Sequence, residues 1–304
     1  MKWFLLALIA LLFWSGSDFF SKVGSKPDDK LSHWKMVMAV GFVMGLHAAY
    51  EVIFAGVPIS LDIIIAYLPA SFLYILSMAI GYIGLRYIEL SVSSPICNSS
   101  GAMSALMCFF ILHERMEPIQ TVAVVVICFG VLLLGIVSYT EDDEKRALRQ
   151  AKSEVKYTKS LIAVLIPVIY CLIDAAGTFA DSILLKTLNE ESANVAYEFT
   201  FLAMGIVSAI YVLMIKREPL TRERDLPKLI GGICETIGQF AYVFALAAYA
   251  IGAAPVISAY CVASVVWSRI FLKEKLSWKH YLAIAITVVG IVLLGIYEGI
   301  SGEA

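Results

Sequence analysis

The chain has 304 residues, of which 60% are hydrophobic and only 16% are charged, and its formal net charge is −2. Soluble domains carry about 25% charged residues, and a soluble fold this apolar would expose large hydrophobic patches, so the composition excludes an ordinary soluble domain. The near-neutral charge and the lack of a basic tract exclude nucleic acid as an expected partner.

Ten apolar segments are long enough to cross a bilayer as helices, which takes about 20 residues each. In chain order, we expect these helices at 3–21, 34–55, 63–86, 92–112, 118–139, 160–186, 196–215, 228–249, 253–272 and 280–298. The first segment is similar to a signal peptide but lacks a small-residue cleavage site, so we expect it to remain as a helix. The predicted fold class is an all-α integral membrane protein that contacts the lipid bilayer along ten transmembrane helices.

Polar faces interrupt several of these helices. An ionised side chain at mid-membrane costs about 2.5–3.5 kcal/mol on insertion scales, so such residues are candidates for function. A spacing of four places Trp14 beside Asp18 on one face of the first helix, because residues four apart share a helical face. The full candidate substrate site combines acids, amides and aromatic rings from six helices: Trp14, Asp18, Tyr74, Asn98, Tyr170, Asp174, Glu235, Gln239, Tyr242, Tyr260 and Trp267.

Two roles are open for the acids of this site. Carboxylates beside aromatic rings suit an organic cation, through ion pairing and cation–π attraction. Desolvated carboxylates can also carry protons or another coupling ion. The structural alternative for Asp18, Asp174 and Glu235 is a buried, hydrogen-bonded packing residue. Asp181 lies nearer a helix end and fits a functional and an interfacial position equally well.

One pattern occurs twice in the chain, 160 residues apart. Pro95 and Glu114 recur as Pro255 and Glu274, and two glycines follow each Glu at the same spacing, Gly130 and Gly135 in one copy and Gly290 and Gly295 in the other. We expect Pro95, Glu114, Pro255 and Glu274 to be structural, each Glu with a backbone or basic partner in its own half. The repeat predicts two like-folded halves, residues 1–140 and 160–304, joined by a charged linker at 141–159.

Charge indicates how the halves lie in the membrane. Of the 23 Lys and Arg residues, only Lys2, Arg115 and Lys186 lie in the loops and termini of one side. The positive-inside rule then places the linker in the cytoplasm and both termini outside. Because five helices per half is an odd number, the two halves must enter the membrane in opposite directions. Such inverted repeats are typical of secondary transporters.

These features resemble the drug/metabolite transporter superfamily, in its EamA-like branch. The resemblance rests on the five-plus-five repeat, the prolines before the fourth and ninth helices, and the Leu-x-Glu ends at 112–114 and 272–274. The usual Gly before this Glu is His113 in one copy and Lys273 in the other. The family implies a basket of helices 1–4 and 6–9 around a central cavity, with helices 5 and 10 outside it. It also implies a monomer, or a homodimer through helices 5 and 10, in a bacterial plasma membrane.

The function predicted from the sequence is secondary active transport of a small polar metabolite by alternating access. We expect a cationic or zwitterionic substrate such as an amine, a choline-like cation or an amino acid. No catalytic residue, metal site or cofactor is expected, and no ATPase motif is present. The alternatives are an intramembrane enzyme using Asp18 and Asp174, and a facilitative exchanger of nucleotide-like or other neutral or anionic metabolites.

Overall fold

The structure is a computed structural model that describes residues 2–25, 29–87, 90–140, 161–273 and 276–301. Within these ranges it consists of helices and short connections, without a strand. Seven of the helices are long and apolar enough to cross a membrane by length and composition, and shorter apolar helices accompany them. The all-α membrane fold class is therefore confirmed. The linker at 141–159 and Glu274 lie outside the described residues.

The helices follow one another in two similar series. The first series is α1 (Lys2–Gly24), α2 (Ser32–Tyr50) with a π-helical end η1 (Glu51–Ala55), α3 (Leu61–Gly84), α4 (Leu90–Cys97), α5 (Ser100–Phe110) and α6 (Pro118–Tyr139). The second is α8 (Leu161–Leu184), α9 (Glu190–Ala209) with a π-helical end η2 (Ile210–Ile215), α10 (Arg222–Ser258), α11 (Tyr260–Phe271) and α12 (Trp278–Ser301). The π-helical ends thus fall at matching places in both series.

The ten expected segments do not appear as ten separate helices. The fourth is divided into α4 and α5, while the eighth and the start of the ninth form the single helix α10. A kink at Tyr249, with φ −161° and ψ 79°, separates the two parts of α10. The ninth segment is then broken again between Ser258 and Tyr260, which matches the α4–α5 break 160 residues earlier.

Each break lies a few residues beyond one of the repeated prolines. Pro95 and Pro255 lie inside their helices rather than in the first turn, because α4 begins at Leu90 and the second part of α10 follows directly after Tyr249. A proline has no N–H group to donate to the preceding turn. At the first break the Ser99 N–H donates to Ile96 O, three residues back, at 3.3 Å, and the Ser99 hydroxyl donates to Pro95 O at 3.0 Å.

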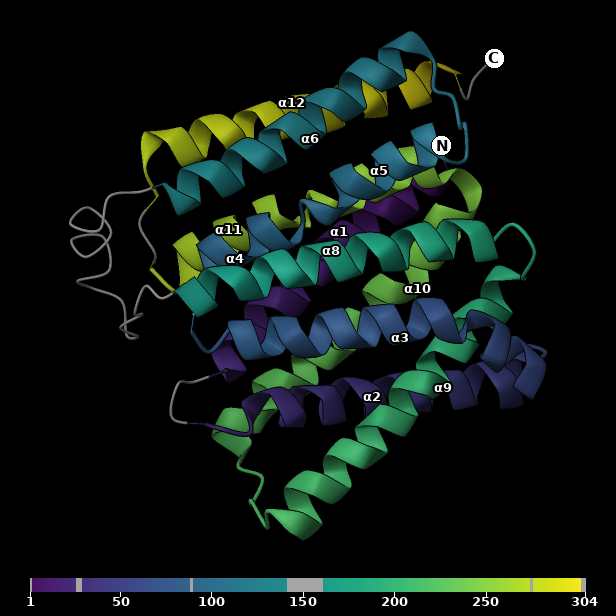
Figure 1. Cartoon of the computed structure of the whole chain (residues 1–304), viewed down its shortest axis with the longest axis vertical. Coiled ribbons are helices and arrows are strands. Elements are labelled where there is room, and N and C mark those ends of the chain that lie inside the picture. The colour runs from purple at the N-terminus through teal and green to yellow at the C-terminus, as the bar shows by residue number, and fades with distance from the viewer. Residues whose placement is uncertain (1, 26–28, 88–89, 141–160, 274–275, 302–304) are drawn as a thin grey trace.

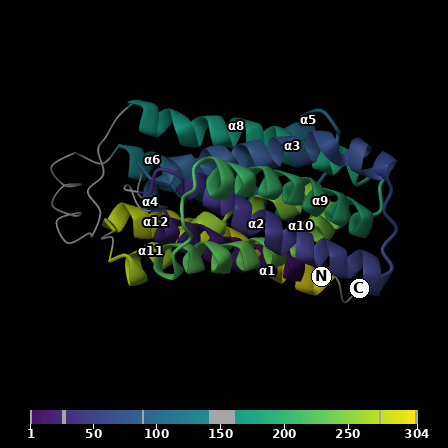
Figure 2. The same ribbon diagram turned by 90° about the horizontal axis from the view of Figure 1, so that it is seen from below.

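The helices pack as pairs that combine the two halves. α6 packs on α12 and α2 packs on α9, and between these outer pairs α1 packs on α10 and α3 on α8. Figure 1 shows α6 with α12 along one edge of the molecule and α2 with α9 along the other, and Figure 2 shows the same bundle from below. In both views α1 begins and α12 finishes at the same end, here called the Lys2 end; the opposite end, where α1 finishes, is the Gly24 end.

The loops after α5 and α11 share an unusual backbone. His113 has φ 53° and Lys273 has φ 57°, both in the left-handed region that favours glycine. The family that the sequence resembles usually has Gly at these two positions. The left-handed conformation of the loop explains the preference for Gly there. Glu114 pairs with Lys186 at 2.9 Å, which gives it a basic partner from the other half rather than from its own.

Candidate functional site

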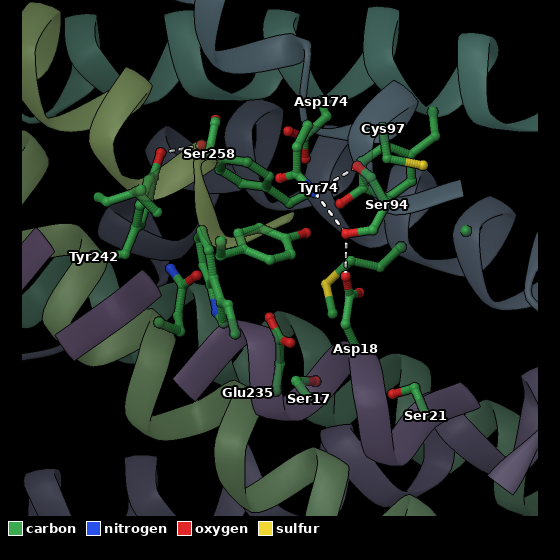
Figure 3. Close-up of a pocket in the computed structure, with 18 of the residues that line it drawn as sticks. Ser17, Asp18, Ser21, Tyr74, Ser94, Cys97, Asp174, Glu235, Tyr242 and Ser258 are labelled. Carbon is green, nitrogen blue, oxygen red and sulfur yellow. Dashed lines mark hydrogen bonds between the residues drawn. The ribbon is translucent and has the colours of Figure 1, made fainter. Parts of the chain in front are cut away.

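A central cavity lies between α1, α3, α4, α8 and α10, and its lining extends from the middle of these helices to Leu85 and Leu90 near the Gly24 end. The cavity has a volume of about 80 Å³, enough for several waters or for part of a small metabolite. Ser17, Asp18, Tyr74, Asp174, Glu235 and other lining residues surround this space in Figure 3. The cavity is thus formed by side chains from both halves of the chain.

Ten of the eleven residues of the candidate substrate site line this cavity. They are Trp14, Asp18, Tyr74, Asn98, Tyr170, Asp174, Glu235, Gln239, Tyr242 and Tyr260. Trp267 is not among the lining residues. It lies on α11, where its Nε1 donates to the Ser15 hydroxyl at 3.1 Å. Asp181 is fully buried, with 0% of its surface exposed, so its side chain does not reach out to the membrane surface; it does not line the cavity either.

Asp18 is held by serines from both halves. The hydroxyls of Ser94 on α4 and Ser264 on α11 donate to its Oδ2, at 2.5 Å and 3.0 Å. Figure 3 shows Ser94 directly opposite Asp18. Asn98, one turn beyond Ser94, donates its Nδ2 to Ser94 O at 2.8 Å and so orients this part of α4. Neutral hydroxyls therefore solvate the carboxylate without pairing its charge.

Asp174 is held in the same way, by two serines of the first half, with the Tyr170 hydroxyl of its own helix also close to the carboxyl group. Ser100 on α5 donates to Oδ2 at 2.7 Å, and Ser77 on α3 donates to Oδ1 at 3.3 Å. Asp174 itself belongs to α8 in the second half. The two serine hydrogen bonds therefore cross from one half to the other at the wall of the cavity.

The third acid has fewer donors. Glu235 on α10 is 8% exposed and has the Ser17 hydroxyl beside it, as Figure 3 also shows. One turn further, the amide Nε2 of Gln239 has no hydrogen-bond partner among the described residues, and the same holds for Nε1 of Trp14. Two buried donors near the Glu235 carboxylate thus lack a hydrogen-bond partner among the described residues.

Aromatic rings form the rest of the wall. Trp14 packs against Tyr242 with ring centroids 4.9 Å apart and against the edge of Tyr260 at 5.8 Å. Gly238 makes this possible, because a Cβ atom there would lie 2.8 Å from Nε1 of Trp14. Tyr74 meets Tyr242 edge-on at 6.0 Å. These rings line the same cavity as the three carboxylates.

The lining has three acids and, among the residues that the structure describes, no Lys, Arg or His. Three serines that donate to its acids, Ser77, Ser94 and Ser100, were not predicted from the sequence. Of these three, Ser94 lines the cavity itself. The sequence does contain a sign of Ser94 and Ser100, because six serines cluster around Pro95: Ser91, Ser93, Ser94, Ser99, Ser100 and Ser104. Serine is common in membrane helices as a packing residue, so this cluster by itself does not point to a carboxylate.

The comparisons with known proteins agree with the two-part architecture. The profile of the EamA-like transporter family matches residues 1–136 and again residues 161–296. No curated protein matches the chain. A solved structure, described as "Crystal structure of protein", is similar over 97% of this chain and 96% of its own, with 16% sequence identity and a TM-score of 0.63. At that identity the likeness shows the fold alone.

Proposed function

The chain belongs to the EamA-like transporter family of the drug/metabolite transporter superfamily, and from this premise we propose that it is a secondary active transporter of a small cationic or zwitterionic metabolite. The central cavity is the proposed substrate site. Amines, choline-like cations and amino acids are the substrate classes that its chemistry fits. The proposed location is the bacterial plasma membrane, with the Lys/Arg-rich Gly24 end in the cytoplasm and both termini outside.

One observation supports the cationic substrate most strongly. Asp18, Asp174 and Glu235 face one small cavity whose described lining has no basic side chain. A buried carboxylate that receives only neutral hydrogen bonds remains costly, because no opposite charge offsets its desolvation. A cation or a proton that enters the cavity supplies the missing charge. An anionic substrate would instead add a further negative charge.

The aromatic wall supports the same proposal. Trp14, Tyr74, Tyr242 and Tyr260 line the cavity beside the acids. A quaternary ammonium group over an aromatic ring gains about 0.5–2 kcal/mol, with the larger value where water is excluded. The ammonium group of an amine or amino acid would gain from the carboxylates as well. The unpaired Nε2 of Gln239 offers a hydrogen bond to a carboxylate or hydroxyl on the same substrate.

Alternating access is the proposed mechanism. Three hydrogen bonds of the acids join the two halves. Ser264 donates to Asp18, and Ser77 and Ser100 donate to Asp174. If the halves rock against each other, these bonds break or form, so the charge state and solvation of the acids change with the conformation. Binding of a cation to the acids would then bias the same equilibrium. A monomer, or a dimer through α6 and α12, is the proposed assembly.

A thermal-shift screen of the purified protein tests the proposed substrate class. The panel contains choline, other amines and amino acids, with nucleosides and dicarboxylates as neutral and anionic comparisons. A ligand that binds only the folded state stabilises it by RT ln(1 + c/Kd), where c is the free ligand concentration, and so raises the unfolding temperature. We expect stabilisation by cations or zwitterions. Stabilisation by dicarboxylates alone would contradict the proposal.

A further inference from the structure

A second buried acid lies on α8, outside the central cavity. Asp181 follows Asp174 by seven residues, which places it on the same helical face about 10 Å nearer the Lys2 end. Its side chain is fully buried. The Tyr67 hydroxyl donates to Oδ1, and the Tyr74 and Tyr242 hydroxyls lie close to the same carboxyl group. Oδ2 has no hydrogen-bond partner within the described part of the chain.

Among the described residues, no Lys, Arg or His offsets the charge of this carboxyl group. The titratable groups that face it are Tyr67 and Tyr74 from α3, Tyr242 from α10, Tyr197 from α9 and Asp174 from its own helix. On α5, Cys108 faces Ser182, the residue that follows Asp181 in the chain. No contact with Lys, Arg or His is recorded for Asp181 in the described ranges. The ion pair of Lys186 with Glu114 lies beyond the end of α8, more than a turn further along the chain than Asp181.

The tyrosine hydroxyls around Asp181 continue to the central cavity. Tyr74 donates to Oγ1 of Thr178 at 3.0 Å and also forms a hydrogen bond with the Tyr242 hydroxyl. All three of these residues line the cavity. Tyr74, Tyr242, Tyr67 and Asp181 therefore form one layer of hydroxyl and carboxyl groups that closes the cavity toward the Lys2 end.

A second pocket lies on the other side of this layer. Its lining includes Ser182 on α8, Leu185 just after α8 and Leu246 on α10, together with the charged residues Glu114, Arg115 and Lys186. Ser182 is adjacent to Asp181, Leu185 follows it by one turn, and Leu246 follows Tyr242 by one turn. Asp181 itself lines neither pocket, but its neighbour Ser182 lines the pocket at the Lys2 end, and the Tyr74 and Tyr242 hydroxyls close to its carboxyl group line the central cavity.

We propose that Asp181 is a proton-binding site that exchanges protons between the pocket at the Lys2 end and the central cavity. A hydronium ion in that pocket gives its proton to Oδ2 and becomes water. The carboxylic acid later passes a proton to the hydroxyl oxygen of Tyr74 or Tyr242. That tyrosine releases its own hydroxyl proton toward the cavity, where Asp174 is an acceptor, so each tyrosine ends as it began. This proposal rests on the proposed function, for which it names the coupling ion.

Infrared difference spectroscopy of the purified wild type and Asp181→Asn tests the site without any substrate. We expect a carboxylic acid C=O band in the wild type that is lost in Asp181→Asn, shifts in D2O and disappears as the pH rises. Tyr67→Phe removes one hydrogen-bond donor and should shift the band. Asp62→Asn, which removes an exposed aspartate at the start of α3, should leave the band unchanged.

Two results would overturn the proposal. The first is identical carboxyl spectra for the wild type and Asp181→Asn at every pH, which means that Asp181 stays ionised. The second is an Asp181 band that neither titrates nor shifts in D2O, which means that the group is a fixed packing residue. If Asp181→Asn does not fold, an unshifted carboxyl band in Tyr67→Phe overturns the proposal instead. A thermal-shift screen without any hit would contradict the proposed substrate and leave the assignment of this band unaffected.

Discussion

At the scale of single residues, the acids of the cavity are solvated by serines rather than paired with cations. Asp174 depends on two hydroxyls from the opposite half, Ser77 and Ser100. A hydrogen bond to a charged group contributes about 1.5–3 kcal/mol, so these serines fix the position of the carboxylate while leaving its charge available. That availability is the chemical basis of the proposed cation site.

Asp174→Asn should weaken binding of a cation in the cavity. The amide has nearly the same shape and keeps part of the hydrogen bonding, but it has no charge to attract an ammonium group. We expect a loss of at least about tenfold in affinity, or about 1.4 kcal/mol, for the cation that stabilises the wild type most. Isothermal titration calorimetry measures it, with Asp62→Asn as the matched control at an exposed position. Equal affinities in all three proteins would rule out Asp174 as a ligand.

His113 allows a separate test of backbone strain. Its φ of 53° is easy for Gly, tolerable for His and costly for a β-branched residue. His113→Gly should therefore be at least as stable as the wild type, while His113→Val should be less stable by about 1–2 kcal/mol. Thermal unfolding in detergent ranks the three. A Val variant as stable as the Gly variant would show that this loop relaxes out of the left-handed conformation.

Sequence patterns located most of the cavity wall but not its details. Asp18, Asp174 and Glu235 stand out in apolar helices because an acid there is costly, and the structure places all three at one cavity. The spacing that put Trp267 in the same set does not specify depth or the neighbouring helix, and its indole bonds to Ser15 instead. The donors Ser77, Ser94 and Ser100 were missed because serine also packs between membrane helices without contacting an acid.

At the scale of elements, the repeated glycines hold α6 against α12. A Cβ atom on Gly130 would lie 2.8 Å from the backbone N of Thr287, and one on Gly290 would lie 2.9 Å from the backbone N of Ile127. Each glycine thus meets the backbone of the other helix, in a matching arrangement. The first glycine of the repeated pattern is therefore explained by close packing between the two halves.

Gly130→Ala should force these two helices apart. Overpacking a close contact costs about 1–3 kcal/mol, so we expect a lower unfolding temperature, and the same for Gly290→Ala. Gly135→Ala is the matched control on the same helix, because a Cβ there has no neighbour closer than 3.8 Å. Thermal unfolding of the three variants decides the point. Gly130→Ala and Gly135→Ala melting together would contradict the packing role.

Helix positions were predicted well, and their interruptions were not. α6 matches the segment expected at 118–139, and α1 extends the first expected segment by a few residues. The breaks after Cys97 and Ser258 and the kink at Tyr249 do not follow from apolarity, which only reports that a segment favours lipid. Such interruptions depend on how the hydrogen bonds of a helix are replaced by its neighbours, which a single sequence does not display.

At the scale of the whole molecule, ion pairs between the halves close the Gly24 end. Lys228 on α10 is fully buried, and its Nζ lies 3.2 Å from Asp29 and 2.8 Å from Asp225. Lys35 on α2 also reaches Asp29, at 3.5 Å. Because Lys228 and Asp29 belong to different halves, opening this end has to separate a buried ion pair.

Lys228→Met should loosen the closure at the Gly24 end. Removing one partner of a buried pair costs about 3–5 kcal/mol, here in favour of conformations that separate the halves. In a variant that keeps Cys97, which lines the cavity, as its only cysteine, we expect faster labelling by an impermeant maleimide from the Lys/Arg-rich side. Lys186→Met, which breaks the Glu114 pair at the Lys2 end, should not increase labelling from that side. Equal rates in both variants would contradict the closing role.

In the proposed mechanism, the cavity carries a cation across the membrane by means of its acids. Uptake into proteoliposomes of the cation that stabilises the protein most tests this claim directly. We predict saturable uptake by the wild type, and a loss of at least about tenfold in its rate at low substrate in Asp174→Asn. Unchanged uptake in that variant, or uptake of dicarboxylates in preference to cations, would contradict the account.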